Sequence, residues 1–110
     1  MAYDPELADR VRHTVAGMAD ATEKKMFGGL AFLIGGNMAV AASGEGGLLL
    51  RADPAGSADL CANPGVERAV MHGKAMDGWL RVSPEAVELD DALDRWVRVG
   101  VDYASSLPVK

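Results

Sequence analysis

The segment "KKMFGGLAFLIGGNMAV", residues 24–40, constrains the fold more than any other part of the chain. It places a continuous apolar run, Leu30–Ile34, between two glycine pairs. A short apolar run bounded by glycines is typical of a buried strand. The sequence Gly35-Gly36-Asn37 is typical of a hairpin turn, because such turns need backbone angles that Gly and Asn tolerate. We therefore expect antiparallel strands here, with a bulge or tight bend at Gly28-Gly29.

The glycine pairs could instead belong to a ligand-binding loop. A phosphate-binding P-loop needs Lys-Ser/Thr after its last glycine, because these side chains meet the phosphates and the magnesium ion. The segments "GGLAF" and "GGNMA" stand here instead. A dinucleotide-binding fingerprint needs G-x-G-x-x-G at the start of a helix, and neither pair precedes a helical pattern. The sequence therefore favours turns in a sheet over a phosphate loop.

The remaining segments alternate between helical and strand patterns. Asp4-Pro5-Glu6 predicts the start of an amphipathic helix that ends near residues 17–20. Asp53-Pro54 repeats this signature before a short helix, and Ser83-Pro84-Glu85 predicts a turn or a single helical turn. Further strands are predicted over residues 22–27, 38–42, 48–52, 66–72 and 78–82.

The last helix has the clearest periodicity in the chain. Its apolar stripe has spacings of 4, 3, 4, 3 and 4 and consists of Leu89, Leu93, Trp96, Gly100, Tyr103 and Leu107. Asp90 or Asp91 would serve its N-terminus. Gly100 costs about 1 kcal/mol of helix propensity, so we expect a neighbouring element to approach the helix closely there.

The resulting order of elements is α-β-β-β-β-α-β-β-α. Strands grouped together with helices outside them predict an α+β fold, with one antiparallel sheet of about five to six strands and helices mainly on one face. The chain has 110 residues, of which 49% are hydrophobic and 25% charged. This length and composition predict a single domain over residues 1–110, with one hydrophobic core.

Charge and cysteine content exclude several classes of protein. The net charge is −5, whereas proteins that bind nucleic acid directly normally present a basic face. The acidic N-terminus does not resemble a signal peptide, and the longest apolar stretch is too short to cross a bilayer. A single cysteine cannot form an internal disulfide. We therefore expect a cytoplasmic protein without membrane contact or direct nucleic-acid binding.

Few residues are candidates for reactive chemistry. A nucleophilic Cys needs a lowered pKa and a positioned base, and Cys61 lies in a weakly patterned short helix, which favours a structural thiol. His13 and His72 are the histidines that could serve it. The segment Met71–Met76 could hold copper(I), but one His between two Met is more typical of core and turn residues. Acidic residues at 88–94 are typical of a helix N-terminus. No catalytic residue, cofactor or metal is therefore predicted.

Basic residues in the strands offer another candidate site. They could bind an anion or an acidic partner if the fold brings them together, and they are Lys24, Lys25, Arg68, Lys74 and Arg81. The alternative is a set of dispersed, solvated charges, which is the commoner arrangement and the one that we favour.

Several segments together resemble a known family. They are residues 24–40, "GLLLR" at 47–51, "HGKAMDGWLRV" at 72–82 and "LDRWVRVGVDYASSLP" at 93–108. In this order and spacing they resemble the TfoX N-terminal domain family, which is linked to the TfoX/Sxy competence regulators. The motif residues, which we interpret as structural, are Met26, Phe27, Gly28, Gly29, Asn37, Met76, Gly78 and Trp79.

The resemblance implies an antiparallel sheet flanked by helices, and it supplies no catalytic residues. Competence regulators carry this domain before a second, helical domain, so the chain resembles the stand-alone members. We therefore predict a non-enzymatic regulatory or protein-interaction domain that binds a protein partner or a second copy of itself. The alternative is a domain that binds a small molecule or an anion through the five basic residues. Such a domain could have weak enzymatic activity, with Cys61 and His72 as the reactive groups.

Overall fold

The computed structural model describes residues 3–26, 28–71 and 73–109. Within these ranges, one antiparallel sheet has the strand order β1-β2-β3-β4-β6-β5. Its strands are β1 (Thr22–Met26), β2 (Gly29–Ile34), β3 (Asn37–Ala42), β4 (Leu48–Arg51), β5 (Val66–Met71) and β6 (Lys74–Val82). The helices are α1 (Pro5–Ala16), α2 (Ser57–Cys61) and α3 (Asp90–Ser106), with 3-10 turns at Pro54–Gly56 and Pro84–Val87. The predicted α+β class and order of elements are confirmed.

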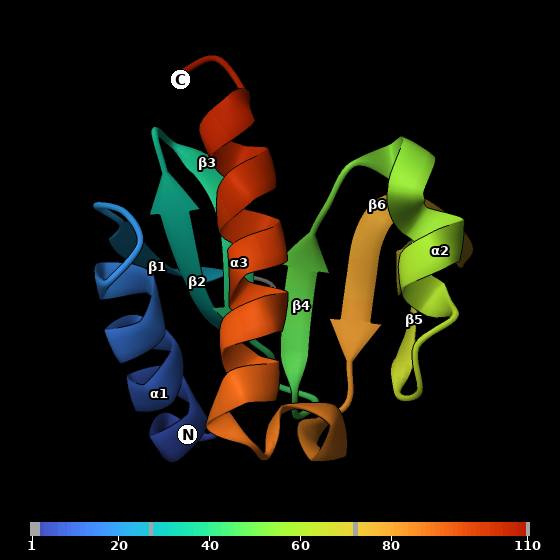
Figure 1. Ribbon diagram of the computed structural model, residues 1–110, viewed down its shortest axis with the longest axis horizontal. Helices are drawn as coiled ribbons and strands as arrows, with labels where there is room; N and C mark the ends of the chain where they lie inside the picture. The colour runs from blue at the N-terminus through green and yellow to red at the C-terminus, as the bar shows by residue number, and fades with distance from the viewer. Residues whose placement is uncertain (1–2, 27, 72, 110) are drawn as a thin grey trace.

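The helices cover one face of the sheet. Figure 1 shows α1 and α3 in front of β2, β3 and β4, and α2 in front of the β5–β6 end. Alternation along β4 directs Leu48 and Leu50 toward the helices, where both are fully buried, and Leu49 toward the opposite face. The main core therefore lies between the helices and one side of the sheet.

The predicted helix start at Asp4-Pro5 is confirmed, and the same arrangement recurs twice. The Asp4 carboxylate accepts a hydrogen bond of 2.9 Å from the backbone N–H of Glu6. Asp53 accepts one of 2.9 Å from Ala55, and the Ser83 hydroxyl accepts one of 3.3 Å from Ala86. In each case a proline follows the capping residue and fixes the first φ angle.

Glycines close the first two hairpins. Gly35 and Gly36 have φ angles of 59° and 83°, between the paired residues Ile34 and Asn37. Two positive φ angles in a two-residue turn match the twist of antiparallel strands, so the predicted hairpin turn is confirmed. The tight bend at Gly28-Gly29 is also confirmed, because Met26 pairs directly with Gly29.

The bulge near this segment lies in β3. Phe32 pairs with Val40 and Leu33 with Met38, which leaves Ala39 as an extra residue. Helix α3 approaches the sheet at this bulge, because a Cβ atom on Gly100 would lie 2.4 Å from the Ala39 carbonyl oxygen. The predicted close approach at Gly100 is therefore confirmed.

Two sequence-based expectations need correction. Strand β6 begins at Lys74, whereas a strand was predicted only from Gly78, because Lys74 and Ala75 pair with the end of β5 beyond a shift in register. In α3, Leu89 is 74% exposed, since it is the N-cap residue and precedes the face that meets the sheet. The buried face is instead widened by Val97, Val101 and Ala104.

None of the helices in the described ranges combines the length and the apolar character needed to cross a membrane.

Candidate functional site

The second face of the sheet carries a separate apolar cluster. Its members all lie on strands, and they are Met26, Ala31, Leu33, Met38, Ala41, Leu49, Ala69 and Trp79. We call this set the helix-free face. The central residues are buried, whereas Met26, Leu33 and Trp79 pack around them and remain partly exposed. The sheet thus presents partly exposed apolar side chains on the side opposite its helices.

The predicted basic residues are spread across the sheet. Lys24 and Lys25 lie on the edge strand β1 and Arg68 on the other edge strand β5, with β2, β3, β4 and β6 between them. At about 4.8 Å per strand this separation is roughly 24 Å along the sheet. Lys74 is exposed at the start of β6.

Two of these basic side chains are already paired with carboxylates. The Arg68 guanidinium donates a hydrogen bond of 2.7 Å to Asp77. Arg81 forms an ion pair with Glu45 and donates a hydrogen bond of 3.3 Å to the Ser43 hydroxyl. The fold therefore distributes the five cations over β1, β5 and β6 and pairs two of them with carboxylates, so they do not converge on one site.

The motif Met76-x-Gly78-Trp79 is held by contacts around Gly78. The Gly78 backbone N–H donates a hydrogen bond of 2.7 Å to the Ser57 hydroxyl, and its carbonyl accepts one of 2.9 Å from Ala52. Its φ angle is 83°, and a Cβ atom there would lie 3.0 Å from the Ala52 carbonyl oxygen. Gly78 can therefore not be replaced without strain. Ser57 is fully buried, so this hydrogen bond fixes the strand just before Trp79.

Ser57→Ala is expected to lower the free energy of unfolding by about 2 kcal/mol, because it leaves the buried Gly78 N–H without an acceptor. Urea unfolding of the purified variant measures the change. Ser106→Ala is the matched control, since Ser106 is exposed and bonds only within its own helix. Equal unfolding midpoints for the two variants would contradict a structural role for Ser57.

Asn37 of the same motif set joins the β2–β3 hairpin to the end of the chain. Its side chain is 3% exposed and donates a hydrogen bond of 2.9 Å to the carbonyl of Pro108. Gly29 lies against β3, since a Cβ atom there would be 2.1 Å from the Ala42 carbonyl oxygen. Phe27 of the motif and the candidate reactive residue His72 lie outside the described residues.

Trp79 lies beside Arg51, which no motif in the sequence marks as a candidate site residue. Arg51, at the end of β4, is the cross-strand partner of Trp79, and its guanidinium carbon lies 5.3 Å from the centre of the Trp79 ring. The same carbon lies 5.7 Å from the ring of Tyr103 on α3. Arg51 therefore connects the helix-free face to the helix layer. The one feature of the sequence that could have pointed to this residue is its position, because Arg51 is a charged residue at the end of the apolar strand "GLLLR".

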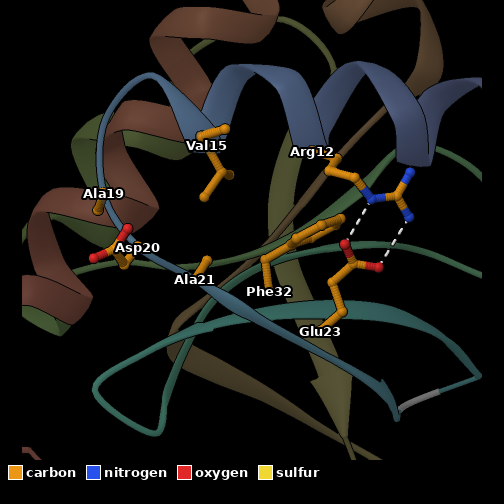
Figure 2. A pocket seen from close by; sticks show the side chains of 8 residues that line it. Arg12, Val15, Ala19, Asp20, Ala21, Glu23 and Phe32 are labelled. Carbon is orange, nitrogen blue, oxygen red and sulfur yellow. Dashed lines mark hydrogen bonds and ion pairs between the residues drawn. The ribbon is translucent and has the colours of Figure 1, made fainter.

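A shallow pocket of about 200 Å³ lies between α1 and β1 (Figure 2). Phe32 and Val15 form its apolar floor. At one end, Arg12 donates two hydrogen bonds to Glu23, of 2.6 Å and 2.9 Å. Figure 2 shows Asp20 at the opposite end. The pocket is smaller than typical ligand sites, which enclose about 300–1,000 Å³.

The Arg12–Glu23 pair predicts a pH-dependent contribution to stability. The hydrogen bond from Arg12 lowers the pKa of Glu23 from its ordinary value of 4.5. A carboxylate whose pKa is lower in the folded state stabilises the fold above its unfolded-state pKa, and this contribution is lost as the pH falls through the folded-state pKa.

Glu23→Gln removes the charge that pairs with Arg12, so we expect it to lower the melting temperature at pH 7. The decrease should be only a few degrees, because the pair is exposed and exposed ion pairs contribute little to stability. The difference from the wild type should disappear well below pH 4.5. Melting curves of both proteins across this range measure it, with Glu85→Gln as a control at an exposed carboxylate. A difference that persists in acid would show that the Glu23 charge is not its cause.

The candidates for reactive chemistry lie apart from one another. Cys61 is partly exposed on α2, which packs on β5 and β6, whereas His13 is exposed on α1, which packs on β2 and β3. Among the described residues, no three carboxylate, imidazole or thiol groups are close enough together to hold a metal ion.

The fold and the motif residues define a class of small α+β domains, with three helices of the described chain on one side of an antiparallel sheet. The sequence profile of the TfoX N-terminal domain matches residues 13–104. The chain therefore belongs to the TfoX N-terminal domain family. No curated protein matches the sequence.

Proposed function

We propose that this domain acts by binding another protein, in a regulatory role and without catalysis, and that the helix-free face is its contact surface. The observation that carries this proposal is the apolar cluster of that face. Met26, Leu33 and Trp79 are partly exposed there and lie on strands from β1 to β6. Partly exposed apolar side chains on a sheet face without a covering helix offer contacts to a protein partner.

Family membership supports the same function, because the resemblance described above links this domain to the TfoX/Sxy competence regulators. The reducing cytoplasm is the expected compartment, because the single cysteine, Cys61, is a free thiol. A regulatory partner would then be a cytoplasmic protein.

Capture of proteins from native lysate on the immobilised domain tests the proposal. We expect specific capture by the wild type and its loss in Leu33→Lys, which adds a charge to the helix-free face and lets the long side chain reach solvent. The matched control is Leu89→Lys, because Leu89 is 74% exposed and lies at the start of α3 on the helix side. Circular dichroism verifies that both variants are folded.

The result that would contradict the proposal is equal capture by the wild type and Leu33→Lys, or no specific capture by either. The partner could also be a second copy of the domain. Light scattering of the purified domain tests this by measuring its oligomeric state. A dimer that dissociates in Leu33→Lys and persists in Leu89→Lys would identify self-association through this face.

A second candidate function is binding of a small molecule in the α1–β1 pocket. Arg12 is already paired with Glu23, whereas Asp20 forms no ion pair with any described residue. A carboxylate without an ion-pair partner attracts a cation, so this pocket favours a small apolar ammonium compound. The anion suggested by the sequence would have bound the five basic residues, which lie elsewhere on the sheet. Butylammonium at 100 times its dissociation constant would add about 2.7 kcal/mol of stability. Absence of a thermal shift, or an equal shift in Ala21→Leu, which narrows the pocket, would remove this candidate.

A further inference from the structure

Arg51 differs from the other arginines of the described chain in its contacts. Each of the others donates a hydrogen bond to an oxygen acceptor, and they are Arg10, Arg12, Arg68, Arg81, Arg95 and Arg98. The Arg51 side chain forms no hydrogen bond or ion pair with a described residue, and its guanidinium instead lies over the rings of Trp79 and Tyr103. A contact with an aromatic ring uses the positive charge but provides no acceptor oxygen. The five N–H donors of the guanidinium therefore have no acceptor among the described residues.

These ring contacts also hold the guanidinium in place. Both ring centres lie within the range of about 6 Å at which a cation and an aromatic ring attract. Arg51 is partly buried, and its backbone is fixed by pairing with β6. An immobilised guanidinium loses little side-chain entropy when it binds, so it is preorganised for a planar, two-oxygen acceptor. A carboxylate provides such an acceptor through two parallel hydrogen bonds.

The surroundings favour a protein carboxylate over other anions. A free small molecule needs a pocket that buries most of its surface, and the α1–β1 pocket and three further hollows among the described residues, of about 160 to 390 Å³, are all lined by residues other than Arg51. Nucleic acid is disfavoured by the net charge of −5. Trp, Tyr and Arg are the residues most enriched at the energetic centres of protein interfaces, and Trp79 belongs to the helix-free face.

We propose that Arg51, between Trp79 and Tyr103, binds an aspartate or glutamate side chain of the protein partner, next to apolar contacts on the helix-free face. This inference rests on the proposed protein-binding function and specifies the partner's chemistry. The partner segment carries an acidic residue adjacent to an apolar one. The acidic residue forms the paired hydrogen bonds with Arg51, and the apolar residue packs beside Trp79.

Nuclear magnetic resonance of the arginine side chains tests the site without a known partner. The probe is an acetylated, amidated peptide of sequence Leu-Glu-Leu, compared with Leu-Gln-Leu at the same ionic strength. We expect the Nε–Hε resonance of Arg51 to shift saturably with the glutamate peptide and not with the glutamine peptide. Arg98 is the internal control, because it is exposed on α3 and paired with Asp94. Equal shifts at Arg51 and Arg98, or no shift at Arg51, would overturn the site.

Capture from lysate separates this inference from the function on which it rests. Arg51→Met keeps an unbranched apolar side chain against both rings and removes every donor, and Arg51→Lys keeps the charge without the planar fork. We expect both variants to weaken partner binding about tenfold or more, and Arg98→Met to leave it unchanged. Undiminished capture by Arg51→Met would overturn this inference while leaving the protein-binding function in place. No capture by the wild type would overturn both.

Discussion

Gly29→Ala is expected to lower the free energy of unfolding by about 3 kcal/mol, the largest effect of any single methyl group added to the first hairpin. The added Cβ atom would lie 2.1 Å from the Ala42 carbonyl oxygen and 3.2 Å from the Gly44 nitrogen. Both atoms belong to the backbone, so no side chain can move aside to relieve the overlap. Strand β2 would have to separate from β3 at its first residue.

Thermal unfolding measures this effect, and a loss of about 3 kcal/mol corresponds to a fall in melting temperature of more than about 10 °C. Neighbouring glycines provide the controls. Gly28→Ala meets open space but has a φ angle of 71°, so it should cost only about 1 kcal/mol. Gly56→Ala meets open space at an ordinary φ angle and should be close to neutral. Similar melting temperatures for Gly29→Ala and Gly56→Ala would contradict the packing of β2 on β3.

Gly100→Ala is expected to have the second large effect on stability. The substitution raises the helix propensity of α3 but crowds the packing of the helix against the sheet. Alanine favours a helix by about 1 kcal/mol over glycine. The added Cβ atom, however, would lie 2.4 Å from the Ala39 carbonyl oxygen and 2.6 Å from a methyl group of Leu50. Overpacking against a backbone atom costs about 3 kcal/mol, so we expect a net loss of about 2 kcal/mol.

Urea unfolding of Gly100→Ala measures the net sign. The double variant Gly100→Ala with Leu50→Ala should not recover stability, because the overlap with the Ala39 carbonyl remains. Gly17→Ala, at the C-cap of α1, is the matched control, since its nearest neighbour would be 3.6 Å away. A more stable Gly100→Ala protein would mean that α3 does not approach β3 as closely as the structure has it.

The parts of the fold that depend on short stretches of chain could be predicted from the sequence. The hairpin at Gly35-Gly36 and the caps at Asp4, Asp53 and Ser83 each depend on a few adjacent residues with defined backbone preferences. The close approach at Gly100 was also predictable, because a glycine on an apolar helical stripe is costly unless a neighbour requires it.

Features that depend on the order of strands could not be predicted in the same way. The pairing of β4 with β6 places Arg51 beside Trp79, 28 positions later in the sequence, and no local pattern encodes this contact. The same order places Lys24 and Arg68 on opposite edges of the sheet. The start of β6 was missed because Lys74 and Ala75 pair only across a shift in register. Candidate sites built from scattered residues therefore require the topology of the sheet.

Photo-crosslinking in cells that make this protein tests the central claim, that the helix-free face binds a protein, most directly. A photoreactive phenylalanine analogue replaces Leu33, which is partly exposed on that face, or Leu89, which is exposed at the start of α3 on the helix side. The predicted result is a discrete protein adduct from position 33 that is missing from position 89. An absence of adducts from position 33, or the same adducts from both positions, would contradict the claim.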